Sequence, residues 1–161
     1  MGAVACLVIV VMALLPTFIN KIKAYAEGKV VDVEQTVNFN LPDSFSSFDF
    51  QFGDRFGPER DNIDVKMVIE VVFDDPAEIN DFESRVQRSA LWETGFNELG
   101  FAMVPLEAEA LLTTGSDFMV YNIETGEYNI FPASGNTYEC LFLAYDDLHE
   151  TLTIYRFTIT V

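Results

Sequence analysis

Residues 63–79 have the sequence IDVKMVIEVVFDDPAEI, in which a strand pattern is followed directly by a helix start. From Ile63 to Phe73 every second residue is apolar, which predicts a β-strand with one buried face. Val68 and Val72 add apolar residues to the other face. We therefore expect this strand to be central and to be covered on both sides near its end.

The residues after this strand predict a helix. Asp75 can accept hydrogen bonds from the unpaired N–H groups of a first helical turn, and Pro76 needs no donor there. Glu78 completes a pair similar to a capping box. An apolar stripe follows at Ile79, Phe82 and Val86. We expect this helix to end by about Trp92.

The rest of the chain predicts further strands and a shorter helix. The strands cover residues 29–39, 48–52, 118–123, 127–131, 138–145 and 151–161, and the short helix covers residues 105–112. The elements do not alternate as β-α-β units, which favours an antiparallel sheet. The predicted fold is α+β, with a sheet of about seven strands and one or two packed helices behind an N-terminal membrane-spanning helix.

The first part of the chain differs in composition from the rest. Residues 2–19, GAVACLVIVVMALLPTFI, contain no charged side chain. As a helix this run would span roughly 27 Å, close to the thickness of the hydrocarbon core of a bilayer. We therefore expect residues 2–19 to interact with the membrane, with residues 1–26 as a membrane anchor or signal segment and residues 27–161 as a soluble, acidic α+β domain.

Three interpretations of this run are open. A cleaved signal peptide would use the small residues Ala24 and Ala26 at its cleavage site, but no basic stretch precedes the apolar run. A lipid anchor would use Cys6, but too few apolar residues precede it. We favour the third interpretation, an uncleaved single-pass anchor.

The step Pro16-Thr17-Phe18 after the apolar run is similar to the N-terminal helix of type IV pilins over about 20 residues. The run has no Glu near its start, and Gly28 stands where a pilin helix would continue. No site or function is transferred on this resemblance.

The side of the membrane is an open question in the sequence. Lys21 and Lys23 follow the run, and the positive-inside rule would place the domain in the cytoplasm. A small domain behind one N-terminal span is more often outside, and we expect an extracytoplasmic domain.

Charge excludes some classes of function. The chain has 9 Lys and Arg against 26 Asp and Glu, a net charge of −17. Such an excess of acid repels phosphate backbones, so we expect no binding of nucleic acid, and any protein partner should present a basic face. One His and two Cys favour neither a zinc site nor a histidine-based triad. We expect no cofactor and no metal.

Two surface segments are candidate binding sites. The turn at residues 146–150 contains Asp146, Asp147 and His149, although Asp is common in turns for backbone reasons alone. The loop at residues 54–61 contains Arg55, Phe56 and Arg60, and loops of this kind often carry binding residues. A self-neutralising surface turn is the simpler interpretation of that loop.

Aromatic and acidic side chains add a few further candidates. Trp92 at the predicted helix end is either an exposed contact or, as we favour, the edge of the core. Phe48, Phe50 and Phe52 alternate along their strand, which favours a core-facing position over a ligand cage. Glu107 and Glu109 concentrate acid on the short helix.

The sequence therefore favours a membrane-tethered, non-enzymatic binding or accessory domain of unknown ligand, which recognises a protein or another basic partner. A carboxylate-based hydrolase acting at the cell envelope is one alternative, because such enzymes need no His. A structural subunit of an envelope assembly is another. No catalytic residues are assigned, because the sequence contains no recognisable catalytic motif.

Overall fold

The computed structural model describes residues 2–52, 62–94, 104–113, 115–129 and 134–161. For residues 2–19 and for Phe48, Phe50 and Phe52 it describes the backbone alone. The chain divides into two compact units, Met1–Phe39 and Asn40–Val161. The described part contains three helices and one antiparallel sheet of six strands, which confirms the α+β fold class, with one strand fewer than the predicted number of about seven.

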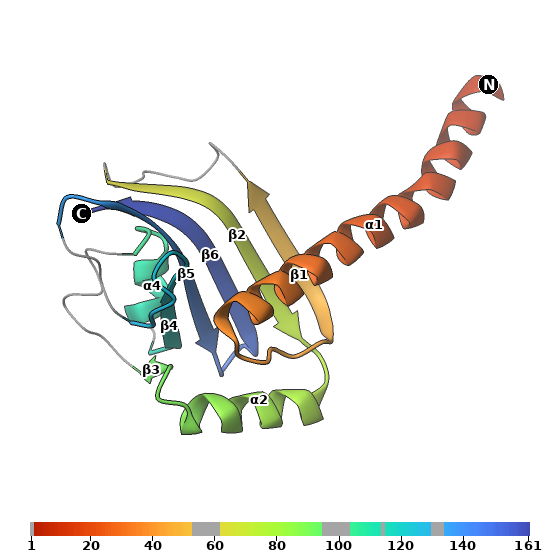
Figure 1. The fold of residues 1–161 in the computed structure, drawn as a ribbon. Coiled ribbons are helices and arrows are strands. Elements are labelled where there is room, and N and C mark those ends of the chain that lie inside the picture. The colour runs from red at the N-terminus through yellow and green to blue at the C-terminus, as the bar shows by residue number, and fades with distance from the viewer. Residues whose placement is uncertain (1, 53–61, 95–103, 114, 130–133) are drawn as a thin grey trace. The chain divides into compact units, whose positions relative to one another are not determined.

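The first unit consists mainly of one helix, α1 (Gly2–Val37), which is 36 residues long (Figure 1). The prediction of a strand over residues 29–39 is therefore wrong. Gly28 lies inside the helix and does not end it. The helix ends at Val37, and the next residue, Asn38, has a left-handed backbone with a φ of 45°. The N–H of Phe39 then bonds to the carbonyl of Glu34 at 3.3 Å.

Side-chain burial explains why this segment is helical. The buried residues of α1 are spaced by four, three and four positions, which places them on one face of a helix; they are Ala26, Val30, Val33 and Val37. An alternating strand pattern also fits part of the stretch, and it would bury Val31 with Val33. Val31 is 43% exposed, as the helical spacing requires.

Among the residues whose side chains are described, no helix combines the length and the apolar character needed to cross a membrane. The predicted membrane segment, residues 2–19, is helical in its backbone, and its side chains lie outside the described ones.

The second unit is built on the sheet. Its strands are β1 (Phe45–Phe52), β2 (Ile63–Phe73), β3 (Glu93–Thr94), β4 (Asp117–Asn122), β5 (Thr137–Asp146) and β6 (Thr151–Thr160). They lie in the order β1-β2-β6-β5-β4-β3, with every neighbouring pair antiparallel (Figure 1). The strand predicted over residues 63–73 is confirmed, and it is central, between β1 and β6.

One predicted strand is nearly absent. In the described part of residues 127–131, pairing is limited to an isolated bridge between Tyr121 and Tyr128. The backbone of Asn129 is left-handed, with a φ of 52°, and so departs from the extended conformation of a strand. In the preceding turn, the side-chain oxygen of Asn122 accepts hydrogen bonds from the N–H groups of Glu124 and Thr125 at 3.0 and 3.1 Å.

A bulge in β2 changes the expected face of several residues. Val65 pairs with Phe157, but Met67 pairs with Arg156, the next residue on β6. Val65 and Met67 therefore lie on opposite faces of the sheet. The expectation that all alternate residues from Ile63 to Phe73 share one face is wrong for this reason.

Helix α2 (Pro76–Arg88) begins as predicted and crosses one end of the sheet (Figure 1). The Asp75 side chain accepts the N–H of Ala77 at 2.8 Å. The predicted capping-box role of Glu78 is not what the structure shows, because its carboxylate instead accepts the N–H groups of Asp43 and Ser44, both at 3.1 Å. The helix ends at Arg88, within the expected limit of about Trp92, because the next residue is extended.

An aromatic cluster joins α2 to the sheet. The Phe82 ring lies 5.7 Å from Phe73, 4.9 Å from Tyr145 and 5.9 Å from Trp92, measured between ring centroids. Trp92 is buried, which confirms its expected place at the core. The Tyr145 hydroxyl donates to the Glu83 carboxylate at 3.1 Å, and burial together with this hydrogen bond raises the pKa of Tyr145.

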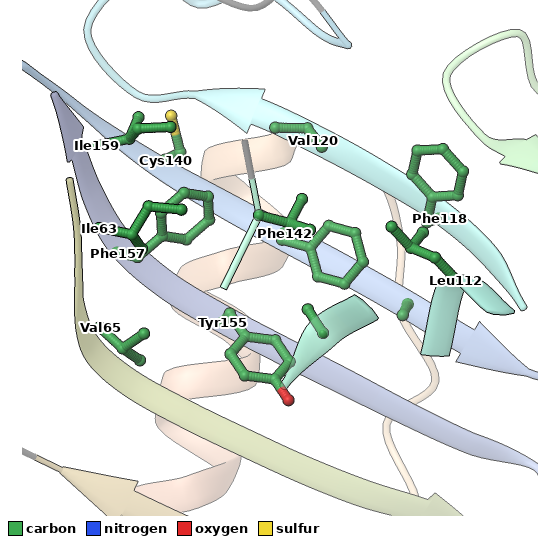
Figure 2. Packing of buried hydrophobic residues seen from close by; sticks show 13 residues of the cluster. Ile63, Val65, Leu112, Phe118, Val120, Cys140, Phe142, Tyr155, Phe157 and Ile159 are labelled. Carbon is green, nitrogen blue, oxygen red and sulfur yellow. The ribbon is translucent and has the colours of Figure 1, made fainter. Parts of the chain in front are cut away.

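The short predicted helix is α4 (Ala108–Thr113), which begins three residues later than expected. Its Ala108 and Leu112 belong to a buried cluster with residues of β2, β4, β5 and β6, among them Phe142 and Phe157 (Figure 2). We call the sheet face that carries this cluster the α4 face. Val68 lies at the edge of the cluster and is only partly buried.

Candidate functional site

A groove lies on the sheet at the edge of this buried cluster. Its volume is about 250 Å³, and its lining residues come from β1, β2, β6 and the turn before α4; they are Asp49, Gln51, Val68, Glu70, Glu107, Thr153 and Tyr155. We call it the acidic groove, because three of these seven side chains are carboxylates.

Strand pairing sets the positions of the groove residues. Asp49 pairs with Glu70, which pairs in turn with Thr153, and these three form one row across β1, β2 and β6. Directly opposite side chains in an antiparallel pair have Cβ atoms about 5 Å apart. The next row, two residues along, is Gln51, Val68 and Tyr155.

The two carboxylates of the first row are direct neighbours. Like charges that face each other across a strand pair are destabilising. Gln51 partly offsets this arrangement, because its amide nitrogen lies 3.5 Å from an oxygen of Asp49.

The floor of the groove carries two hydroxyl groups. Thr153 is 4% exposed and Tyr155 is 6% exposed, yet both line the groove. Burial raises the pKa of Tyr155 to about 12, with further increases from the charges of Glu107 and Glu70. The negative charges of Glu107 and Glu70 therefore make the Tyr155 hydroxyl harder to deprotonate.

The carboxylates do not form a metal centre. Within the described part of the chain, no group of three or more His, Cys, Asp or Glu side chains could hold a metal ion. The arrangement instead provides negative charge around two hydroxyl groups and an apolar side chain. It can attract a cation and hydrogen-bond to its N–H groups.

The turn predicted at residues 146–150 is stabilised by its own hydrogen bonds. One oxygen of Asp146 accepts the N–H groups of Leu148 and His149 at 3.0 and 3.3 Å, and the other lies 2.6 Å from Nδ1 of His149. Partial burial raises the pKa of Asp146, but the hydrogen bonds from the His149 side chain and backbone outweigh it, and the pKa is lowered. Asp147 and His149 are exposed beside it.

Of the other sequence candidates, those that the structure describes do not line the acidic groove. Arg55, Phe56 and Arg60 lie outside the described residues. Trp92 is buried against Phe82 in the aromatic cluster. Cys140 is buried in β5, and burial raises the pKa of its thiol to about 12, so it is a core residue rather than a nucleophile.

Sequence reasoning missed most of the groove. Glu107 was noted as a local concentration of acid, but Asp49, Glu70, Thr153 and Tyr155 were not singled out. The available signal is the set of three charged positions, Asp64, Lys66 and Glu70, on an otherwise apolar strand. The pairing of β2 with both β1 and β6 is needed to show that Glu70 lies beside other polar side chains.

Comparison with known proteins gives no family. No family model, no curated protein and no solved structure matches the chain. Its function is therefore inferred from its own residues.

Proposed function

We propose that the chain is a membrane-tethered, non-enzymatic binding or accessory domain that recognises a protein with a basic face. Charge is the observation that supports this most. The unit Asn40–Val161 contains six Lys and Arg against 23 Asp and Glu, which gives it a net charge of −17. Such a surface attracts cationic partners and speeds their encounter.

The internal ion pairs leave this excess in place. Among the described basic residues of the second unit, Lys66 pairs with Asp64, and Arg156 pairs with Glu139 at 2.7 Å. Arg85 lies 3.1 Å from a carboxylate oxygen of Asp81. Three positive charges are thus matched by neighbouring acids, and six basic residues against 23 acidic ones leave the unit with a large excess of negative charge.

The proposed tether is the apolar run at residues 2–19, which is long enough as a helix to cross a bilayer. We propose that the acidic unit lies on the extracytoplasmic side. Fractionation of cells that express the full chain tests the tether. Recovery in the membrane fraction is expected, and recovery of the intact, unprocessed chain in the soluble fraction would contradict it.

Crosslinking of the full chain in intact membranes tests the binding proposal. The expected result is one reproducible partner whose crosslinked residues lie on a basic face. A partner that contacts the chain through an acidic or a purely apolar surface would contradict the proposal, because charge would then play no part in recognition.

The length of α1 favours a second candidate, a structural subunit of an envelope assembly. Its 36 residues form an unbroken helix about 54 Å long, longer than a bilayer's hydrocarbon core requires. Helices of this length can pack against copies of themselves. Crosslinking between copies in membranes would then give a ladder of multimers, whereas a chain that stays monomeric in membranes would exclude this candidate.

A further inference from the structure

The acidic groove has a feature that electrostatics alone makes unfavourable. Asp49 and Glu70 are direct cross-strand partners, and Glu107 adds a third carboxylate to the same groove. Facing like charges reduce the stability of a sheet. A bound cation would reduce this repulsion, in addition to the contacts that Asp49 and Glu107 already make.

The floor of the groove gives a second, independent observation. The side chains of Thr153 and Tyr155 are more than nine-tenths buried and line the groove. The structure gives neither hydroxyl a hydrogen-bond partner among the described residues. Figure 2 shows the Tyr155 ring within the buried cluster and its oxygen at the cluster's margin. Neither hydroxyl oxygen is fully enclosed, so both can be reached from the groove, and a ligand there can hydrogen-bond to them.

The chemistry of the lining selects the ligand. Carboxylates favour a cation, and the two hydroxyls can accept hydrogen bonds from its N–H groups. Val68 and the ring of Tyr155 offer an apolar wall for a hydrocarbon stem. A metal ion fits less well, because no group of three potential ligands in the described part of the chain could hold one.

Size limits the ligand further. The volume of about 250 Å³ is below the range of roughly 300–1,000 Å³ that drug-sized ligands occupy. A single side chain with a charged end suits such a groove.

We propose that the acidic groove binds the ammonium or guanidinium group of one lysine or arginine side chain from a protein partner. This inference rests on the proposed function, since it assigns the contact point for a basic partner. The stem of the side chain lies along Val68 and Tyr155, and its charged end lies among Asp49, Glu70 and Glu107. The hydroxyls of Thr153 and Tyr155 accept its N–H groups.

A titration of the full chain in neutral detergent micelles tests this directly, with backbone amide signals followed by NMR. The probe is an end-blocked pentapeptide, Gly-Ser-Lys-Ser-Gly, whose only charge is the lysine ammonium group. The matched control is the same peptide with an acetylated, uncharged lysine. The lysine peptide should shift the amide signals of Glu70, Thr153 and Tyr155, and the acetylated peptide should not. Equal shifts with both peptides would overturn the proposal.

Two variants test whether the lysine peptide binds to a carboxylate of the acidic groove. Glu70→Gln removes one carboxylate from the groove and should weaken binding of the lysine peptide about tenfold, as expected for a hydrogen bond to a charged group. Glu127→Gln removes the same charge at an exposed position outside the groove and should change the affinity less than about twofold. An equal loss of affinity with both variants would mean that the overall negative charge of the domain attracts the peptide, and not the groove. That result would overturn the groove proposal and leave the proposed function intact.

A third variant tests the hydroxyl without disturbing the core. Tyr155→Phe keeps the ring and its packing and should weaken binding about fivefold, which corresponds to one ordinary hydrogen bond. Unchanged affinity would show that the hydroxyl makes no contact and would overturn the assigned geometry.

A free polyamine distinguishes the source of the cation. Spermidine shifts the same amide signals if the groove accepts any alkylammonium group. Binding of spermidine with no binding of the lysine peptide would overturn the protein side chain as the ligand. If the crosslinked protein partner binds but neither probe shifts the groove signals, the groove proposal fails and the proposed function stands.

Discussion

Glu78 and Ser44 are separated by 34 residues in the chain and joined by two hydrogen bonds. One carboxylate oxygen of Glu78 accepts the backbone N–H of Ser44 at 3.1 Å and its hydroxyl at 3.2 Å. The same oxygen accepts the N–H of Asp43 at 3.1 Å. The first turn of α2 thereby holds the segment that leads into β1, and β1 supplies one side of the acidic groove.

We predict that Glu78→Ala lowers the free energy of unfolding by about 1–2 kcal/mol, because it leaves the N–H groups of Asp43 and Ser44 without their acceptor. A urea titration of the full chain in detergent, followed by circular dichroism, measures the change. Glu127→Ala is the control, since this exposed carboxylate makes no described side-chain contact, and it should change the midpoint little. A matching loss in the two variants would contradict the prediction.

Phe82 is the centre of the aromatic cluster, with Phe73, Tyr145 and Trp92 around it. We predict that Phe82→Ala lowers the free energy of unfolding by about 3–5 kcal/mol, because it leaves a cavity in a fully buried site. Phe82→Leu retains much of the volume and should cost about 1–2 kcal/mol. Thermal unfolding monitored by Trp92 fluorescence gives both values, and equal effects would rule out a packing role.

Gly28 lies in the interior of α1, and a Cβ atom built on it would meet no other atom within 4 Å. We predict that Gly28→Ala stabilises the helix by about 0.5–1 kcal/mol, because alanine is the better helix former. Gly28→Pro should break it. Amide hydrogen exchange of residues 24–37 in the full chain measures both changes, and protection that is the same in all three chains would mean that the helix ends before Gly28.

Asp146 links stability to pH. Its pKa is lowered from the ordinary value of 3.8 in the folded chain, because the hydrogen bonds from His149 and Leu148 outweigh the effect of partial burial. A carboxyl whose folded pKa is lowered adds stability above its unfolded pKa and loses it as the pH falls through the folded pKa. This stability is therefore present above about pH 4 and is lost below it.

Asp146→Asn tests this linkage. The variant should be less stable than the parent chain at pH 6, and the difference should shrink as the pH falls below 4. Urea midpoints at several pH values give the comparison, with Asp147→Asn as the neighbouring control. A difference that grows in acid would have the wrong sign for the assigned pKa.

Local patterns predicted the parts of the fold that depend on neighbouring residues. The alternation in residues 63–73 gave β2, and Asp75 and Pro76 gave the start of α2, because both signals act within a few residues. The segment at residues 29–39 fits two periods, since Val33 and Val37 belong to both a strand pattern and a helix stripe. Exposure of Val31 separates the two, and exposure is not visible in the sequence.

The candidate site could not be predicted because it depends on long-range pairing. Glu70 lies beside Asp49 and Thr153 only because β2 pairs with both β1 and β6. The bulge between Val65 and Met67 then decides that Val68 and Glu70 share the α4 face with Tyr155. Asp146 shows the opposite case, since its turn was predicted from residue type and its carboxylate is occupied by local hydrogen bonds.

The rate of association with the crosslinked protein partner, measured against ionic strength, tests the central claim most directly. The full chain is held in zwitterionic nanodiscs, and the sodium chloride concentration is raised from about 50 to 300 mM, which shortens the Debye length from about 14 to 6 Å. The account predicts that the association rate falls about tenfold while the dissociation rate changes much less, because the excess of acid acts on encounter. An association rate that does not change with salt would contradict it and would leave the acidic surface with a role in solubility alone.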